Sequence, residues 1–314
     1  MTTRTSTFTY QPSNTVPFRD IDAINRCRQI TRDDIDKHPN PDFKITVMED
    51  IDVEPYFVAD LFSLISKTRE ENRKCVLLLP NPCPTYRHVA HLINQNQINC
   101  DHVWMFALDE YADQDGNIAP SNWEFGFVNS LRSFFWQNID EHLRPPLEQL
   151  IGPNNTNIDH YLDLMMDLGG IDKSYSGPGW TGHMAFIEPD APEFDLPLED
   201  WKEASTRIVT LSPYTIAQNS LHGCFGASGD LAAVPPKAVT IGPKEILTAK
   251  ARMEIAALGV HGTWTSWQRL IARLCYHGPI TPKLPSSILQ TVPTEVIISE
   301  TVAQNIEPTW DKGY

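Results

Sequence analysis

The chain of 314 residues lacks the features that mark several protein classes. Its six cysteines are scattered without a C-x-x-C pair, which argues against a disulfide framework and a zinc ribbon and predicts reduced thiols. No apolar run approaches the ~20 residues that cross a bilayer, and the polar N-terminal segment has no secretory-signal pattern. We therefore expect a cytoplasmic protein that has no membrane partner.

Basic residues are also scarce. The 25 lysines and arginines face 40 aspartates and glutamates, which gives a formal net charge of −15. A surface of this sign repels nucleic acids unless basic residues gather in a local patch, and the sequence contains no such cluster. We therefore expect no nucleic-acid partner.

What is present is the composition of a folded globular protein, with 41% hydrophobic and 10% aromatic residues. Residues 1–40 are polar and contain scattered prolines, so we predict an N-terminal arm with a short helix near Asp20–Gln29. Residues 41–314 are predicted to form one α/β catalytic domain.

From residue 42 onward, strand patterns alternate with helical ones. The expected strands are Phe43–Met48, Cys75–Leu79, Val103–Leu108, Ala238–Ile241, Ile255–Leu258 and Val296–Ile298. The expected helices are Val53–Arg69, Tyr86–Asn94, Asn122–Asn138, Ile158–Leu168 and Trp264–Leu274. The alternation predicts an α/β fold with a doubly wound, mostly parallel sheet and helices on both faces. The segment Lys173–Ser176 is unusually polar for the buried central strand that its position suggests.

Binding sites in such sheets form at the carboxyl ends of the strands. Four segments are expected there: Pro80–Thr85, Asp109–Tyr111, Gly177–Pro189 and Gly259–Thr263.

Motifs in these segments resemble those of a known enzyme family. Residues Phe106–Tyr111 read F-A-L-D-E-Y, Gly169–Asp172 read G-G-I-D, and Gly177–Pro189 read G-P-G-W-T-G-H-M-A-F-I-E-P. In this order the motifs resemble the glucosamine-6-phosphate deaminase/isomerase family, which is related to the 6-phosphogluconolactonases. The A-F-x-E-P tail favours the deaminase branch. The resemblance covers about residues 42–300 and implies that fold, a homo-oligomer, a small-molecule sugar substrate and no cofactor.

The resemblance gives catalytic roles to three residues. Asp109 would carry a proton between adjacent sugar carbons, and His183 would open the sugar ring as acid and base. Histidine suits that role because its pKa allows proton transfer near neutrality. Glu188 would orient and charge the imidazole, as a carboxylate does in hydrolase triads. The alternatives are that Asp109 with Glu110 only caps the following turn, and that His183 among glycines is structural.

Further residues are predicted to contact the substrate. They are Asn81, Cys83, Glu110, Thr181, Gly182, Ala185, His222 and His261. No metal is expected, although three histidines (His183, His222 and His261) together with Asp109 could bind a divalent ion.

The chain departs from the family pattern at the phosphate site. Leu79–Thr85 reads L-P-N-P-C-P-T where the family has L-P-T-G-G-T-P, and prolines remove backbone N–H donors. Leu221 and Gly262 stand where the family has a phosphate-binding arginine and lysine. We therefore predict a substrate without a 6-phosphate, unless charge comes from new positions. The candidates for that are Arg87, Lys244 and Arg269.

Thr181 is a second departure, since the family has an acidic residue there. A hydroxyl can form a hydrogen bond with His183 but cannot stabilise an imidazolium by charge.

Three functions are compatible with these observations. The leading hypothesis is an isomerase or isomerising deaminase of a sugar or amino sugar. A hydrolase of a sugar lactone would use His183 as general base on water, and a catalytically silent sugar-binding homologue would need no acid/base residues. The presence of Asp109, His183 and Glu188 argues against the third. Ammonia release from an amino sugar would separate the first from the second.

Overall fold

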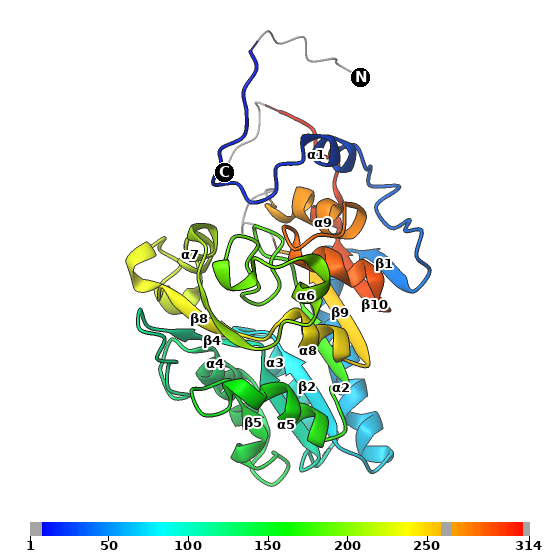
Figure 1. Cartoon of the computed structure of the whole chain (residues 1–314). Coiled ribbons are helices and arrows are strands. Elements are labelled where there is room, and N and C mark those ends of the chain that lie inside the picture. Colours follow the sequence, from blue (N-terminus) through cyan, green and yellow to red (C-terminus); the bar gives the residue numbers. More distant parts are fainter. Residues whose placement is uncertain (1–7, 259–265, 310–314) are drawn as a thin grey trace.

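The computed structural model describes residues 8–258 and 266–309, and in it seven strands form one parallel sheet in the order β1–β10–β9–β6–β2–β3–β5 (Figure 1). The strands are β1 (Phe43–Met48), β2 (Cys75–Leu79), β3 (Val103–Ala107), β5 (Leu150–Ile151), β6 (Lys173–Ser176), β9 (Ala251–Ala256) and β10 (Thr294–Ser299). The predicted mostly parallel α/β sheet is confirmed. The strand predicted at Ile255–Leu258 was placed too late, because β9 begins at Ala251.

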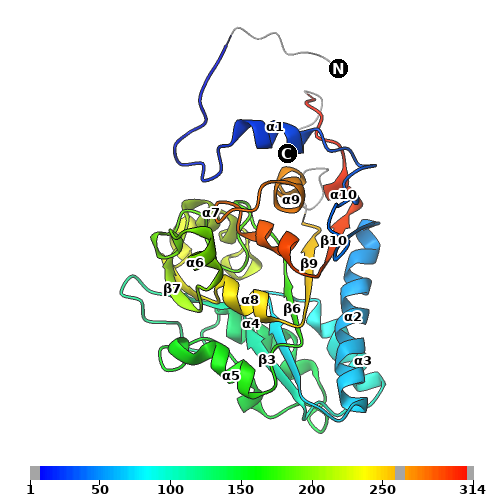
Figure 2. The same cartoon turned by 45° about the vertical axis from the view of Figure 1, so that its right-hand side comes forward.

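Helices cover both faces of this sheet (Figure 2). On one face lie α2 (Asp50–Glu70), α3 (Tyr86–Gln95) and α4 (Phe127–Phe134), and on the other α5 (Tyr161–Asp167), α6 (Leu198–Lys202), α8 (Pro243–Thr248) and α9 (Gln268–His277). The remaining α-helices are α1 (Ile21–Arg28), α7 (Pro213–Asn219) and α10 (Glu300–Ala303). The 3-10 helices are Trp136–Asn138, Leu147–Gln149, Ile158–His160, Pro192–Phe194, Gly223–Phe225, Leu231–Ala233 and Pro285–Thr291. None of the helices in the described ranges has the length and apolar character required to span a bilayer.

The helix predicted at Asn122–Asn138 is shorter than expected. The α-helix starts at Phe127, and the chain ends the segment in a 3-10 turn at Trp136–Asn138. Ile158–Leu168 likewise divides into a 3-10 turn and α5.

A second sheet of three antiparallel strands adjoins the first. It contains β4 (Asp109–Ala112), β8 (Lys237–Thr240) and β7 (Arg207–Thr210), in that order. The strand predicted at Ala238–Ile241 therefore exists but does not join the parallel sheet. Leu108 alone separates β3 from β4: its N–H donates to the Leu79 carbonyl at 3.2 Å, and its carbonyl accepts from Ile241 at 2.9 Å. The chain thus passes from one sheet to the other at Leu108.

The polar strand β6 is buried because its side chains find polar partners on neighbouring elements. Lys173 Nζ lies 2.7 Å from an Asp60 oxygen on α2, and the Tyr175 hydroxyl donates to the other Asp60 oxygen at 2.7 Å. Ser176 donates to Glu254 on β9. Burying polar and charged groups is tolerated where they are paired, so the composition of this strand is compatible with its central position.

The N-terminal segment is anchored to the C-terminal helices. Asp20 caps α1 by accepting from the Ala23 N–H at 3.0 Å, which confirms the helix expected near Asp20–Gln29. Cys27 on α1 packs with Leu274 of α9 in a small apolar cluster. In Figure 1, α1 accordingly lies beside α9.

Arg273 forms hydrogen bonds that join the N-terminal segment to the C-terminal helices, and we call this contact region the junction. Its fully buried guanidinium donates to five backbone carbonyls of the described residues, those of Ile30, Arg269, Val302, Ala303 and Gln304. Burial lowers its pKa to about 10, so it stays charged at neutral pH.

Replacing Arg273 tests whether the N-terminal segment depends on this junction. Arg273→Met leaves several buried carbonyls without donors, each of which costs about 1–3 kcal/mol. We expect the free energy of unfolding, measured by urea titration, to fall by about 3 kcal/mol. The exposed Arg28, changed to Met as a control, should alter stability by less than about 0.5 kcal/mol. Equal unfolding midpoints for both variants would contradict this role for Arg273.

Candidate functional site

A cavity of about 640 Å³ opens where the carboxyl ends of β2, β3, β6 and β9 meet. Residues from three of the four predicted segments line it, namely those in Pro80–Thr85, Asp109–Tyr111 and Gly177–Pro189. The fourth, Gly259–Thr263, lies outside the described residues, as do His261 and Gly262. The volume is within the range of cavities that hold small-molecule ligands.

Asp109 is placed in the cavity wall by the passage from β3 to β4. It is the first residue of β4, opposite Thr240 of β8, and only 5% of it is exposed. Its Oδ1 atom is buried and accepts no hydrogen bond from any described residue. Burial, and then the charge of Glu110, raise the pKa of Asp109 well above its ordinary value. The carboxyl group is thus free to interact with a ligand and is a stronger base than an exposed aspartate.

Glu110 has a different role from its neighbour and does not line the cavity. Its oxygens accept from the N–H groups of Tyr111 at 2.8 Å, Phe127 at 3.0 Å and Val128 at 2.9 Å. These bonds hold the start of α4 against β4, and through it the ring of Phe127, which does line the cavity. The alternative that the Asp109–Glu110 pair only caps a turn therefore holds for Glu110, which binds the start of α4. It does not hold for Asp109.

His183 lines the cavity with its Nδ1 atom directed into the protein. Nδ1 lies 2.9 Å from the Thr181 hydroxyl and 3.2 Å from the Thr215 hydroxyl of α7. A Cβ atom at Gly179 would lie 1.8 Å from Nε2, so only glycine fits beside the ring.

Glu188 contributes charge near His183 and makes no hydrogen bond to it. Its Oε2 lies 3.4 Å from the imidazole Nδ1, yet neither carboxylate oxygen has a hydrogen-bond partner among the described residues. The ring is therefore oriented by the two threonine hydroxyls. Thr181, Gly182 and Glu188 stand behind His183 and are not part of the cavity lining.

Four further predicted residues line the cavity: Asn81, Cys83, Ala185 and His222. Burial lowers the pKa of His222 to about 4, so its imidazole is neutral at physiological pH. Its Nδ1 atom has no partner among the described residues. Burial raises the pKa of the Cys83 thiol to about 11, so it too is uncharged.

Sequence reasoning missed the contribution of two helices. On α7, Gln218 and Asn219 line the cavity; the Asn219 amide donates to the Tyr111 hydroxyl at 2.9 Å, and Gln218 accepts from the Trp180 N–H at 2.9 Å. The first turns of α2 supply four further lining residues, namely Asp50, Val53, Glu54 and Phe57. A usable signal existed for α2, since it directly follows β1 and so starts at the carboxyl edge of the sheet.

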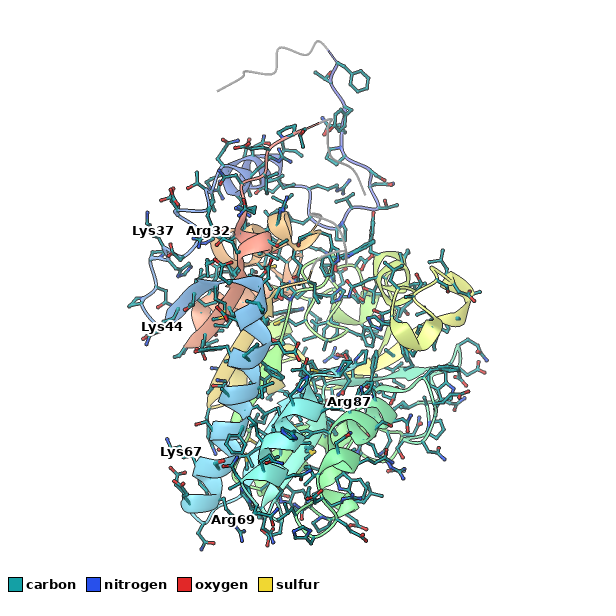
Figure 3. The ribbon with its side chains drawn as sticks, turned by 180° about the vertical axis from the view of Figure 1, so that it is seen from behind. Arg32, Lys37, Lys44, Lys67, Arg69 and Arg87 are labelled. Atoms are coloured by element: carbon teal, nitrogen blue, oxygen red, sulfur yellow. The ribbon has the colours of Figure 1, made fainter. Side chains whose placement is uncertain are left out.

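No lysine or arginine lines the described part of the cavity. The guanidinium of Arg87 lies over the Phe134 ring at 4.5 Å, Lys244 Nζ lies 3.3 Å from Glu203, and Arg269 donates to the Thr301 carbonyl at 2.9 Å. In Figure 3, Arg87 lies apart from the other labelled basic side chains. The three positions considered as new sources of positive charge thus supply none to this cavity.

No cluster of three or more potential ligands suited to a metal ion occurs in residues 8–258 and 266–309. The carboxylates that line the cavity are Asp50, Glu54 and Asp109.

Comparisons with known proteins identify the family. No protein-family model matches the chain. Glucosamine-6-phosphate deaminase from Lachnoclostridium phytofermentans is 31% identical over 223 residues, which cover 69% of this chain and 82% of that protein. Glucosamine-6-phosphate deaminase 2 of Bacillus subtilis is 29% identical, with coverage of 67% and 75%.

Solved structures agree on the fold. A monomeric glucosamine-6-phosphate deaminase superposes with a TM-score of 0.68 at 21% identity, covering 83% of this chain and 99% of that chain. The 6-phosphogluconolactonase from Trypanosoma cruzi gives a TM-score of 0.58 at 14% identity, with coverage of 86% and 100%. The level of sequence identity over most of both chains, together with the shared parallel sheet, shows that the chain belongs to the glucosamine-6-phosphate deaminase family.

Proposed function

We propose that the protein is an aldose–ketose isomerase or isomerising deaminase that acts on an amino sugar lacking a 6-phosphate. The observation that carries this proposal is the Asp109 carboxyl group, which is buried in the cavity wall with an oxygen that no described residue engages. A carboxylate in that state can take a proton from one sugar carbon and return it to the next, provided both lie within hydrogen-bond reach.

His183 would open the ring before this step. It would accept the proton of the anomeric hydroxyl and donate one to the ring oxygen, which yields the open-chain aldehyde. The hydroxyls of Thr181 and Thr215 hold Nδ1, and the Glu188 carboxylate at 3.4 Å would stabilise the protonated ring.

Asp109 would then move the C2 proton to C1, while the carbonyl oxygen on C1 gains a proton and the amine on C2 loses one, so that the open-chain amino aldose becomes an imine at C2. Water would hydrolyse this imine to a ketose and ammonia. Without an amine at C2, the same proton transfer would isomerise an aldose to a ketose.

The composition of the cavity supports a substrate without a phosphate. A phosphate dianion would meet three acidic side chains and no described basic side chain. Proline at positions 82 and 84 removes N–H donors from the loop that follows β2, and Cys83 presents a neutral thiol there. A phosphate would lose hydration in this site with little compensation.

A lactone hydrolase is the second candidate, favoured by the shared fold of the 6-phosphogluconolactonases. In that reaction His183 would activate water, and Asp109 would not be required as a proton shuttle. The proposed cytoplasmic location and homo-oligomeric state both stay predictions.

Asp109→Asn tests the proton shuttle. The variant keeps the shape of the side chain but removes the base. We therefore expect the turnover of the amino-sugar substrate, measured as the rate of ammonia release, to fall at least ~100-fold. Asp159→Asn, at an exposed position, is the matched control and should keep full activity. Turnover within a few-fold of the wild type would contradict the assignment, and retained lactone hydrolysis would favour the second candidate.

The raised pKa of Asp109 also predicts how stability depends on pH. The unfolded chain loses this proton near ~3.9, whereas the folded protein holds it to higher pH. The Asp109 carboxyl group therefore makes the wild type less stable as the pH rises from ~3.9 to the raised pKa. The amide of Asp109→Asn has no proton to lose in this range, so the variant lacks this loss of stability. We expect the variant to melt at a higher temperature than the wild type at neutral pH, with a difference that shrinks toward pH ~4. A difference that stays constant across this range would contradict the raised pKa.

Matched sugars test the absence of a phosphate site. Calorimetry should show tighter binding of glucosamine than of glucosamine-6-phosphate. Leu221→Arg restores the arginine found in the family and should raise affinity for the 6-phosphate, whereas Leu231→Arg, at an equally exposed leucine, should not. Binding of glucosamine-6-phosphate to the wild type at least tenfold more tightly, about 1.4 kcal/mol, would contradict the proposal.

A further inference from the structure

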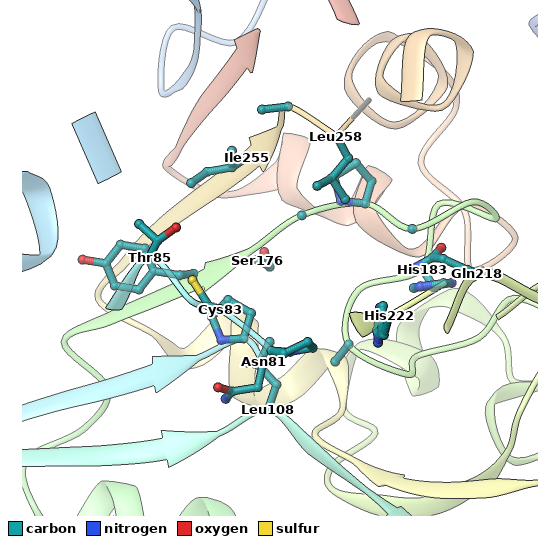
Figure 4. A pocket seen from close by; sticks show the side chains of 18 of the residues that line it. Asn81, Cys83, Thr85, Leu108, Ser176, His183, Gln218, His222, Ile255 and Leu258 are labelled. Atoms are coloured by element: carbon teal, nitrogen blue, oxygen red, sulfur yellow. The ribbon is translucent and has the colours of Figure 1, made fainter. Parts of the chain in front are cut away.

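The cavity has two sides of different chemistry. One side, here named the catalytic side, contains Asp109, His183, Gln218, Asn219 and His222. The opposite side, here named the apolar side, contains Val53, Phe57, Cys83, Tyr175, Ile255 and Ala257, which belong to or pack against the apolar cluster under α2 and α3. In Figure 4 the labelled side chains of Thr85, Cys83 and Ile255 lie across the cavity from His183, Gln218 and His222, with Ser176 between them.

The apolar side offers a ligand few free polar atoms. The Tyr175 hydroxyl donates to Asp60 at 2.7 Å, and the Tyr86 hydroxyl, behind the wall, donates to the Pro80 carbonyl at 2.7 Å. The Phe57 ring packs edge-on against Tyr175 with 5.3 Å between centroids and is tilted against Tyr86 at 6.0 Å. The wall is therefore held by packed rings whose hydroxyls are already satisfied. The polar side chains next to it are Thr85 and Asn81, whose Oδ1 atom has no partner among the described residues.

The charges at this side exclude an anion and give little support to a cation. Both oxygens of Asp50 accept hydrogen bonds from Thr301. The Glu54 side chain is 53% exposed and lies 3.2 Å from His88 Nε2. A carboxylate at such a solvated rim binds a cation weakly. The apolar surface below it is stabilised when an uncharged apolar group covers it.

We propose that the apolar side binds an uncharged hydrophobic substituent carried by the sugar at the end remote from its carbonyl carbon. The inference rests on the proposed function for its orientation: with C1 and C2 of the sugar at Asp109, the other end of the sugar points across the cavity toward Phe57 and Ile255. Substrates of this class are 6-O-alkyl, 6-O-acyl or 6-deoxy sugars. Each methylene buried there contributes about fourfold to affinity.

A homologous ligand series tests the inference. Calorimetry with the full chain would compare glucosamine with its 6-O-methyl, 6-O-propyl and 6-O-butyl ethers, with glucosamine-6-phosphate, and with 6-amino-6-deoxyglucosamine. We expect affinity to rise along the ethers by about fourfold per methylene, and both charged ligands to bind more weakly than the butyl ether. An affinity that is flat or falls along the ethers overturns the inference, and tightest binding of the 6-amino sugar overturns it in favour of a cation site at Glu54.

Leu258→Asp provides the variant, because Leu258 lines the cavity next to Ala257 and is 56% exposed, so folding does not depend on it. The ratio of butyl-ether to glucosamine affinity should fall at least tenfold. Leu231→Asp, at a leucine that is also 56% exposed but does not line the cavity, should leave the ratio unchanged. An unchanged ratio in Leu258→Asp counts against the inference.

The uncharged dye N-phenyl-1-naphthylamine separates this inference from the proposed function, since its binding requires no turnover. Dye fluorescence that the butyl ether displaces, in a protein that neither isomerises nor deaminates the sugars, would leave the apolar side in place and remove the proposed function. If the protein turns over glucosamine but binds no dye, and affinity does not rise along the ether series, the proposed function stands and the inference about the apolar side is overturned.

Discussion

The passage of the chain from the parallel sheet to the antiparallel sheet is the constraint on which the site depends. Leu108 is bonded to Leu79 on one side and to Ile241 on the other, so its backbone belongs to both sheets. The residue that follows is held where the sheets separate. This places the Asp109 carboxyl in the cavity wall, where no described backbone donor reaches its Oδ1 atom. Glu110 then binds the start of α4, and Tyr111 binds Asn219 of α7, so three successive residues define three walls of the cavity.

This arrangement is costly for folding and useful for chemistry. A buried carboxyl without a partner is destabilised in its charged form, which is the physical reason for the raised pKa of Asp109. Glu188 is likewise buried, and its oxygens make no hydrogen bond to a described residue. Such groups are expected where a protein gives up stability for activity. The neighbouring charged strand β6 shows the opposite case, because Lys173 is paired with Asp60.

The cavity combines two regions of different chemistry. Asp109, His183 and the amide side chains of α7 form one polar side, while the opposite side is built from the neutral Cys83 thiol and the packed rings of α2 and β6. Under the proposed function, a change of substrate needs only the apolar side to change, because the proposed proton-transfer groups lie on the catalytic side. The proposed apolar substituent follows from this separation.

The sequence by itself determined the parallel sheet, and it predicted which residues would be reactive. The wholly apolar run Cys75–Leu79 is typical of a strand buried on both faces, and the resemblance of the F-A-L-D-E-Y and G-H-M-A-F-I-E-P motifs to the family pattern singled out Asp109 and His183. Tertiary structure decided how these side chains are engaged and which further helices contribute to the cavity. Nothing local to Glu110 shows that it binds backbone 17 and 18 residues away, and nothing near Phe57 shows that its ring faces the site. Periodicity reports how a segment is buried, whereas the partners of a side chain are set by pairing between segments that are distant in the chain.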